Sequence, residues 1–228
     1  MKEECIVCKK PLVYLEQDEV MECFVCHKKE KSKTKCIDGH YICNKCHTKG
    51  LDGILQVCLS CEDKNPYDVY KKLVDMDFCH MHGPEHHVIV GASLLVAYKN
   101  CGGDVDLQQA LKEMISRGEQ VPGGTCGFWG ACGAGISVGI FVSIITKATP
   151  LTNKPWGLSN QMTSNALGKI AEVGGPRCCK RNSYLAIQTA VEFAKQNLGI
   201  SMPLDQTKCT HQNQNNQCIG IRCPFYNK

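Results

Sequence analysis

The stretch 123–145 reads GGTCGFWGACGAGISVGIFVSII, and its residues 128–145 form a run of 18 without a charge. A run of that length reaches the lower limit for a helix that spans a membrane, about 17 residues. Glycine recurs through its first half, and each glycine weakens a helix by about 1 kcal/mol relative to alanine. Two thiols, Cys126 and Cys132, stand at its start, and no second hydrophobic segment of this kind exists. We therefore predict the buried central helix of a soluble domain, with both thiols at its N-terminal mouth.

The overall composition favours a metal-binding protein. The chain has 228 residues, enough for one domain of ordinary size and a small one. Its net charge of +4 is mild and gives no indication of nucleic acid as a partner. Among its 18 cysteines many form C-x-x-C pairs, and the N-terminus, MKEECIVCKK, lacks the apolar core of a signal peptide. Such pairs without an export signal indicate metal thiolates in a reducing cytoplasm.

The N-terminal segment is expected to be a zinc module. Four C-x-x-C pairs lie within residues 1–62, namely Cys5/Cys8, Cys23/Cys26, Cys43/Cys46 and Cys58/Cys61, and Cys36 and His40 lie between the second and third pairs. Each pair presents two sulfurs to one ion, and a structural zinc ion takes four such ligands. So short a segment, rich in Lys and Glu, cannot build a core of its own, so metal binding must supply its folding energy.

Two groupings of these ligands are open. In the one we favour, a zinc ribbon uses Cys5, Cys8, Cys23 and Cys26, and a treble-clef-like site draws on Cys36, His40, Cys43, Cys46, Cys58 and Cys61. In the other, the pattern from Cys23 onward resembles a RING finger, which implies one ion on Cys23, Cys26, Cys43 and Cys46 and one on Cys36, His40, Cys58 and Cys61. His27 and His47 each follow a cysteine pair; we expect them to be exposed knuckle residues, with a role as spare ligands as the alternative.

Helical periodicity replaces the cysteine pairs beyond residue 64. Asn65 and Pro66 are a cap and a first helical residue, respectively. Further helices are predicted over 88–98, 107–117, the central stretch, 156–173 and 184–198, without an alternating strand pattern in 85–198. The predicted fold is therefore mostly α: a zinc module (1–64), an all-helical bundle (65–200) and an irregular cysteine-containing tail (201–228).

Residues 79–87 read CHMHGPEHH, which holds four of the eight histidines. Such a cluster is typical of a metal site or of acid–base chemistry. Gly83-Pro84 predicts a helix start there, where the helix dipole keeps imidazoles neutral and able to ligate or to take a proton. His80, His82 and His87 are therefore candidate metal ligands. Glu85 and His86 are candidate catalytic groups.

A second loop, GGPRCCKR at 174–181, places Cys178 and Cys179 among three basic residues. Positive neighbours favour thiolates, so both cysteines are candidate catalytic residues. Arg177, Lys180 and Arg181, with Cys126 and Cys132, are candidate cofactor-binding residues. Because each of these groups lies at a helix start or tight loop, we expect all of them to meet the histidine cluster in one pocket at one end of the bundle.

The tail after residue 200 shows no helical periodicity but contains Cys209, Cys218 and Cys223, the last followed by Pro224. This spacing is that of an iron–sulfur cluster with one open iron, or with His211 as its fourth ligand, and the alternative is a strap carried over the main domain.

Four motifs together, HMHGPEHH, VPGGTCGFWGACGAG, GGPRCCKR and the terminal CPFY, carry a resemblance over nearly the whole chain. The chain resembles a cysteine-rich family of uncharacterised function from anaerobic archaea and bacteria, whose members are sometimes labelled methyltransferase-like. That resemblance implies no defined activity. The glycines at 123–135 do not match G-x-G-x-x-G after a strand, so no dinucleotide-type fingerprint supports the methyltransferase label.

Three functions remain open from the sequence. The first is a metal-dependent, iron–sulfur enzyme that uses the Cys/His pocket on a small or sulfur-containing substrate, as a lyase or in desulfuration or sulfur transfer, because soft thiolates at irregular spacings suit a cluster. The second is a RING-like or ribbon interaction module that binds a protein partner, on a helical scaffold. The third is an accessory protein of methyl transfer or cofactor assembly. A cytoplasmic protein with cofactors zinc and an iron–sulfur cluster, without membrane or nucleic-acid binding, is expected.

Overall fold

The computed structural model describes residues 5, 7, 8, 10–47 and 52–228. Its N-terminal module is a hairpin of two antiparallel strands, β1 (Leu12–Glu22) and β2 (Lys29–Cys36), followed by the short helix α1 (Asn44–His47). The strand register pairs Leu12 with Cys36 at one end and Glu22 with Lys29 at the other. An isolated bridge then returns Tyr41 to Cys23. The first residues, on which the expectation of no signal peptide partly depends, lie outside the described part.

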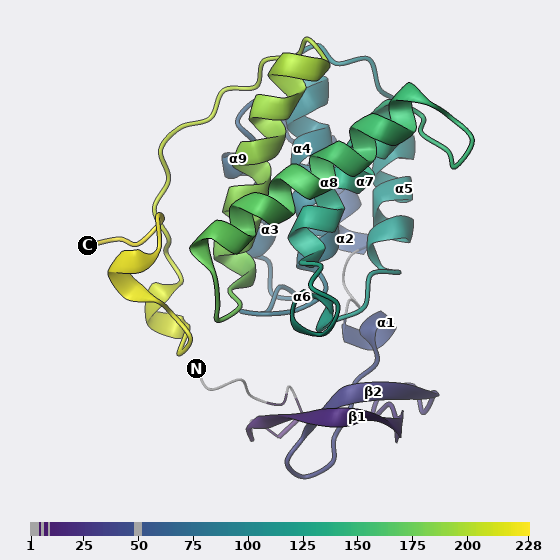
Figure 1. Cartoon of the computed structure of the whole chain (residues 1–228), viewed down its shortest axis with the longest axis vertical. Helices are drawn as coiled ribbons and strands as arrows, with labels where there is room; N and C mark the ends of the chain where they lie inside the picture. The colour runs from purple at the N-terminus through teal and green to yellow at the C-terminus, as the bar shows by residue number, and fades with distance from the viewer. Residues whose placement is uncertain (1–4, 6, 9, 48–51) are drawn as a thin grey trace.

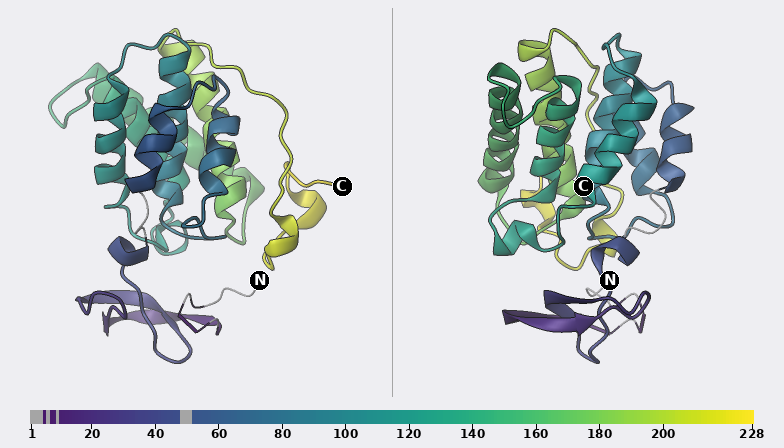
Figure 2. Two further views of the ribbon diagram at one scale, coloured as in Figure 1. Left: turned by 180° about the vertical axis from the view of Figure 1, so that it is seen from behind. Right: turned by 90° about the vertical axis from the view of Figure 1, so that its right-hand side faces the viewer.

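The rest of the chain forms a helical bundle below which the module sits, as Figures 1 and 2 show. Its longer helices are α2 (Asp52–Leu59), α3 (Pro66–Val74), α4 (His86–Asn100), α5 (Leu107–Gly118), α7 (Gly133–Ile145), α8 (Lys154–Val173) and α9 (Cys179–Asn197). The short α6 (Thr125–Phe128) precedes α7. Within the described residues the only sheet is the N-terminal hairpin, so the predicted mostly α fold is confirmed.

Helix α7 occupies the centre of the bundle, as its sequence predicted. It packs against α4, α5, α8 and α9. Val138, Phe141 and Val142 are fully buried in the core. None of the helices in the described part of the chain combines the length and apolar character that crossing a membrane requires.

Polar side chains cap the starts of two helices of the bundle, α3 and α5. Asn65 accepts a hydrogen bond from the Tyr67 backbone N–H, with Pro66 at the first helical position, as predicted. Asp106 caps α5 through the Gln109 N–H. Helix α2, which the sequence assigned to the zinc module, packs against α3, α4 and α5 and contributes Ile54 to the core.

The tail beyond α9 runs back along the bundle toward the module (Figure 1). It contains two single-turn 3₁₀ helices, η1 (Gln212–Gln214) and η2 (Gly220–Arg222). Phe225 packs its ring against Tyr184 of α9, with centroids 5.1 Å apart. The Cys209 N–H donates to the Phe225 carbonyl at 2.7 Å, which closes the tail into a loop.

Candidate functional site

Two groups of metal-ligand atoms lie in the N-terminal module. One comprises Cys5, Cys8, Cys36 and His40, and the other comprises Cys23, Cys26, Cys43 and Cys46. Within the groups, the Sγ atoms of Cys8 and Cys36 lie 3.3 Å apart, and those of Cys26 and Cys43 lie 3.6 Å apart. Four thiolates at 2.3 Å from one tetrahedral ion stand about 3.8 Å from one another. The groups therefore suit one metal ion each.

Backbone donors prepare at least one of these sulfurs to bind metal. Burial alone would raise the pKa of Cys23, but the backbone N–H groups of Cys43, Cys26 and Val25 lower it to about 6. A thiolate, not a thiol, is the ligand form. Cys23 is thus ready to ligate near neutral pH.

The observed grouping differs from both that the sequence suggested. Cys5 and Cys8 do not share a site with Cys23 and Cys26, so the favoured ribbon arrangement is wrong. The RING-like alternative names one group correctly but assigns Cys58 and Cys61 to the other. Along the chain, the first and third ligand pairs form one group, and the second and fourth pairs form the other. This is the interleaved order of a RING finger, but it starts at Cys5 and not at Cys23.

Cys58 and Cys61 lie in the helical part instead. Cys58 is fully buried in the bundle core, where burial raises the pKa of its thiol to about 12. The Cys61 thiol donates to the Asp63 carboxylate at 3.4 Å.

Single cysteine substitutions should separate these arrangements. Cys8→Ser is expected to remove one metal ion from the module, because it deletes one of four ligands, and to leave the Cys23 group loaded. Cys58→Ser should keep both ions and only destabilise the helical bundle. Native mass spectrometry counts the ions. A Cys58→Ser protein that lacks one of them would restore the grouping with Cys58.

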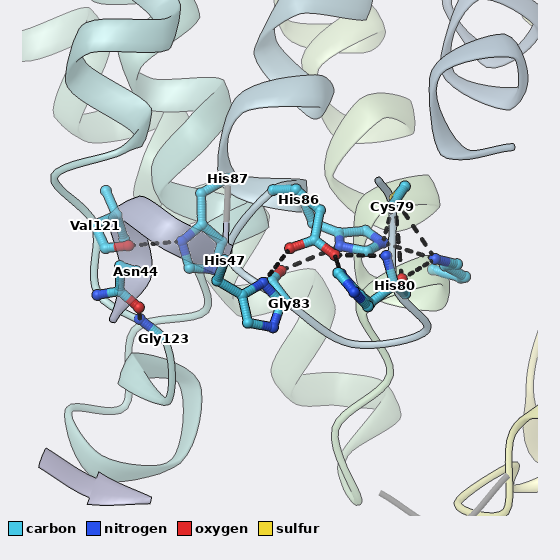
Figure 3. A network of polar contacts seen from close by, with 11 residues as sticks. Asn44, His47, Cys79, His80, Gly83, His86, His87, Val121 and Gly123 are labelled. Atoms are coloured by element: carbon cyan, nitrogen blue, oxygen red, sulfur yellow. Dashed lines mark hydrogen bonds and ion pairs between the residues drawn. The ribbon is translucent and has the colours of Figure 1, made fainter. Parts of the chain in front are cut away.

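A cleft of about 1120 Å³ separates the module from the end of the bundle. Its wall on the module side includes β2, Tyr41 and His47. Its wall on the bundle side carries chemically active side chains, namely Cys79, His80, His82, His87, Cys126, Arg177, Cys179 and Lys180. Asn44 of α1 accepts a hydrogen bond from the Gly123 N–H at 3.3 Å, which ties the two walls together (Figure 3).

Glu85, at the start of α4, is fully buried beneath the cleft. Its Oε1 accepts the His80 backbone N–H at 2.7 Å and lies 3.2 Å from the His80 ring Nδ1. Its Oε2 lies 3.2 Å from Nδ1 of His47, close enough for an ion pair, although the geometry between these two buried atoms is not that of a hydrogen bond. Burial alone would raise the pKa of Glu85, but the neighbouring imidazoles of His47 and His80 outweigh it and hold that pKa well below its usual range.

The atoms of His47, His80 and Glu85 form a third group that can hold a metal ion. Ligands at 2.0–2.2 Å from one ion, at angles between octahedral and tetrahedral, stand about 3.0–3.5 Å apart. Oε2 of Glu85 lies 3.2 Å from His47 and Oε1 lies 3.2 Å from His80, so both separations fall in that range, with one carboxylate oxygen toward each imidazole. An ion there would bind the two buried atoms, Oε2 of Glu85 and Nδ1 of His47, whose mutual geometry is not that of a hydrogen bond. Two imidazoles and one carboxylate are the ligand set of many catalytic iron and zinc centres.

Lys180 forms a buried network beside this group. Its Nζ donates to the His80 carbonyl at 2.5 Å, to Nε2 of His86 at 3.1 Å and to Sγ of Cys79 at 3.8 Å. Burial and the charge of Lys180 lower the pKa of His86 well below its usual value, so the ring is neutral. Its Nδ1 lies 3.1 Å from the Gly83 carbonyl and donates to it, which leaves Nε2 as the acceptor from Lys180 (Figure 3). His86 is thus a positioning residue rather than an exposed acid or base.

His87 and His82 are held by hydrogen bonds of their own. Nδ1 of His87 donates to the Val121 carbonyl at 2.9 Å, and burial lowers the pKa of this imidazole (Figure 3). A Cβ at Gly133 would overlap the His87 ring, which explains a glycine at the start of α7. His82 lies 3.3 Å from the Asn215 side-chain oxygen and accepts the Cys179 N–H at 3.5 Å.

The four thiols expected in one pocket divide between two places. Cys126 and Cys179 line the cleft, and Cys132 lies close enough to both to raise their pKa values, although burial has the larger effect. Cys178 faces the other way. It lines a small cavity together with Cys209, Cys218 and Cys223 of the tail. His82 is in the cleft wall beside Cys179, so Cys126 and Cys179 share the cleft with the histidine cluster, whereas Cys132 contacts the Asn182 side chain and does not line the cleft.

The expected thiolates at Cys178 and Cys179 are not found. Burial raises the pKa of both, to about 12 for Cys179, in spite of the positive charge of Arg177 and Arg181. The prediction considered the effect of the basic neighbours on the thiol pKa but not the larger effect of burial. Arg181 is itself buried and donates to the carbonyls of Gly174 and Pro176, each at 2.8 Å, so it stabilises the loop.

His47 is the residue whose role in the cleft the sequence did not reveal. It was expected to be exposed, with a role as a spare ligand as the alternative, but only 20% of its side chain is accessible, and its ring lies 4.6 Å from that of His80 between centroids, tilted by 58°. The signal available was its position directly after a metal-binding cysteine pair. Because the preceding residue, Cys46, is a ligand of the metal group, the backbone of His47 is held in place and its ring points toward the helical bundle.

Comparisons with known proteins give a family but no activity. Residues 54–226 match a family described as a family of unknown function, DUF5714. The matched region covers the helical bundle and tail and begins within α2, after the two metal groups of the module. Neither a curated protein nor a solved structure matches the chain.

Proposed function

Because the chain belongs to this family of unknown function, we propose its function from the chemistry of the cleft: it is a metal-dependent enzyme that acts on a small, sulfur-containing substrate. The reaction classes that fit are lyase, desulfuration or sulfur-transfer chemistry. The observation that carries this proposal is the group of His47, His80 and Glu85, whose ligand atoms lie within metal-binding distance and include the buried Oε2 of Glu85, 3.2 Å from Nδ1 of His47.

The proposed metal is a divalent transition ion held by His47, His80 and Glu85. Three protein ligands leave coordination positions open, and the two histidines line the cleft. Such an ion supplies Lewis-acid polarisation of a bound substrate atom. Two residues of the chain have supporting roles in this proposal. Arg177 lines the cleft and offers positive charge to an anionic substrate, and Lys180 positions the His80 loop by donating a hydrogen bond to the His80 carbonyl.

Thiols around the cleft support sulfur chemistry in particular. Cys79, Cys126 and Cys179 all line it. Burial holds them as protonated thiols, with pKa values raised to about 12 for Cys79 and Cys179. A thiol that ionises only when substrate or metal approaches is protected from oxidation while the cleft is empty.

The metal groups of the module are proposed to hold zinc. Their ligand sets, three cysteines with one histidine and four cysteines, are those of structural zinc sites. Zinc there fixes α1, and through it His47, against the cleft. In this proposal the module completes the active site rather than standing apart from it.

Glu85→Gln tests the cleft metal. The amide keeps the shape of the side chain but removes the charge, so the variant is expected to lose the cleft ion and to retain both ions of the module. Glu113→Gln is the matched control, because Glu113 lies on the surface of α5 in an ion pair with Arg117. Elemental analysis of both variants counts the metal. Two assays on the same samples test the reaction class: sulfide release from cysteine by elimination, and sulfide release from thiosulfate with a dithiol added as the two-electron reductant and sulfite as the second product.

Two results would contradict this proposal. One is a wild-type chain that binds no transition metal beyond the two zinc ions of the module and any iron–sulfur iron. The other is a Glu85→Gln variant with its full complement of metal and unchanged sulfide release.

A second function has one observation in its favour. The module exposes large apolar side chains beside its metal ligands, with Phe24 at 54%, Val25 at 46% and Ile37 at 62% exposed. Exposed apolar residues next to metal knuckles suit a protein partner. Charge substitutions at Phe24 and Ile37 that abolish capture of a partner, while sulfide release is unchanged, would assign the module that role as well.

A further inference from the structure

The tail from residue 201 to 228 is held in a defined path without long helices or strands of its own. Asn65 donates to the Asp205 carboxylate at 3.2 Å, and His211 lies 3.3 Å from the Asp75 carboxylate. Gln212 exchanges two hydrogen bonds with the backbone of Asn227, at 2.7 and 2.8 Å. A segment with so little core of its own gains stability when a metal group holds it.

Three tail cysteines and one cysteine of the bundle surround a single small cavity. These are Cys209, Cys218, Cys223 and Cys178, the last at the N-cap of α9. The electrostatic effect of Cys178, Cys223 and Cys218 on Cys209 also places the four thiols near one another, although burial has the larger effect in raising the Cys209 pKa. The rest of the cavity wall includes Arg181, Tyr184 and Phe225.

Backbone N–H groups point at most of these sulfurs. Sγ of Cys209 accepts the His211 N–H, and Sγ of Cys218 accepts the Gly220 N–H, each at 3.4 Å. Sγ of Cys178 accepts the Arg181 N–H at 3.4 Å and the Asn215 side-chain amide at 3.5 Å. Donors of this kind stabilise thiolates and set the potential of iron–sulfur clusters.

The spacing of the four sulfurs separates a cluster from a zinc ion. The two groups of the module have all their ligand atoms within 4.8 Å of one another, whereas these four thiols, all in the described part of the chain, do not form such a group. One tetrahedral zinc needs sulfurs about 3.8 Å apart. A cubane cluster holds its thiolates farther apart, because an iron stands between each of them and the cluster centre.

We infer that Cys178, Cys209, Cys218 and Cys223 bind a [4Fe–4S] cluster that fastens the tail to the bundle. Arg181 is buried in the cavity wall and compensates the negative charge of a thiolate-ligated cluster. Four cysteines leave no iron open, so this cluster is one for electron transfer or structure, and the open iron expected from the sequence is absent. His211 pairs with Asp75 instead of serving as the fourth ligand.

The cluster site adjoins the cleft without being part of it. Asn215 donates to Sγ of Cys178, and its side-chain oxygen lies 3.3 Å from the His82 ring, which lines the cleft. Cys178 and Cys179 are adjacent in the chain but face the cluster site and the cleft, respectively. A change of charge at the cluster would therefore alter the electrostatic environment of His82 in the cleft through the Asn215 side chain.

The test is anaerobic purification of the full chain and reconstitution with ferrous iron and inorganic sulfide. The wild type is expected to hold about four iron and four sulfide per chain, with a broad absorption band near 400 nm that bleaches on reduction. Cys178→Ser should lose nearly all of this iron and sulfide. Cys101→Ser is the matched control, because its Sγ donates to the Lys64 carbonyl and lines neither the small cavity nor the cleft, and it should keep the full amount.

A second measurement covers the case in which Cys178→Ser does not fold. Wild-type protein with and without reconstitution is alkylated and its cysteines are mapped by mass spectrometry. Reconstitution should protect Cys178, Cys209, Cys218 and Cys223 together and leave Cys101 unchanged. Reactive tail cysteines after reconstitution, or zinc in place of iron at these four residues, would overturn the assignment. Neither result depends on the activity of the cleft, so failure here is distinct from failure of the proposed function.

Discussion

Removal of the two metal ions of the module, which we propose to be zinc, should unfold residues 5–47 and leave the helical bundle folded. Within the described part of that segment the buried residues are Cys5, Met21, Cys23, Cys36 and Cys43, and four of these are metal ligands. The metal sites are therefore the core of the module. Structural zinc contributes about 10–16 kcal/mol to the folding of such small domains, far more than one methionine can.

Hydrogen exchange is the measurement that resolves this prediction by region. Amides of β1 and β2 should lose protection when a thiol-competent chelator removes zinc, while those of α4 and α7 keep theirs. The same chelator saturated with zinc beforehand is the control. Strands that stay protected after both ions have left would mean that the hairpin folds without metal. If the prediction holds, His47 leaves the wall of the cleft in the metal-free protein and stays there in the control.

The helices were predictable because each carries its own local signals. The periodicity of 107–117 and the Asp106 cap locate α5 to within a residue. The glycine-rich stretch 123–145 correctly predicted a central buried helix, although it folds as α6, a turn and α7. These signals act within one or two helical turns, so no knowledge of the rest of the molecule is needed.

The pairing of the zinc ligands was not predictable, because every C-x-x-C pair presents the same chemistry. The hairpin decides it. The β1–β2 register sets Cys36 opposite Leu12, which brings it to the Cys5/Cys8 loop, and the bridge from Tyr41 to Cys23 brings Cys43 to the other group. Strand register depends on tertiary contacts that spacing alone does not contain.

The opposite directions of Cys178 and Cys179 could have been derived. Consecutive residues at the start of a helix point about 100° apart, so two adjacent cysteines there rarely reach one site. Their burial was less accessible to sequence reasoning, since it comes from the docked tail and the module. That burial reverses the expected effect of Arg177 and Lys180 on the thiol of Cys179.

Phe141→Ala should lower the free energy of unfolding of the bundle by about 3–5 kcal/mol, because the ring is fully buried at the centre of α7 and nothing can move in to fill its space. The ring stands edge-on to Tyr98 at 5.8 Å, an interaction lost as well. Urea unfolding followed by helical circular dichroism measures the change. Leu151→Ala is the control, since Leu151 is 97% exposed and should change the unfolding free energy by less than about 0.5 kcal/mol.

The comparison also tests how the cleft is built. Helix α7 begins at Gly133, directly against the His87 ring. Phe141→Ala should therefore weaken metal binding at His47, His80 and Glu85 only to the extent that it unfolds the bundle. Metal content that falls in step with the folded fraction fits a rigid bundle that supports the cleft. A Phe141→Ala protein as stable as Leu151→Ala would show that α7 is not the centre of the core, because a buried ring cannot be removed from a close-packed interior without cost.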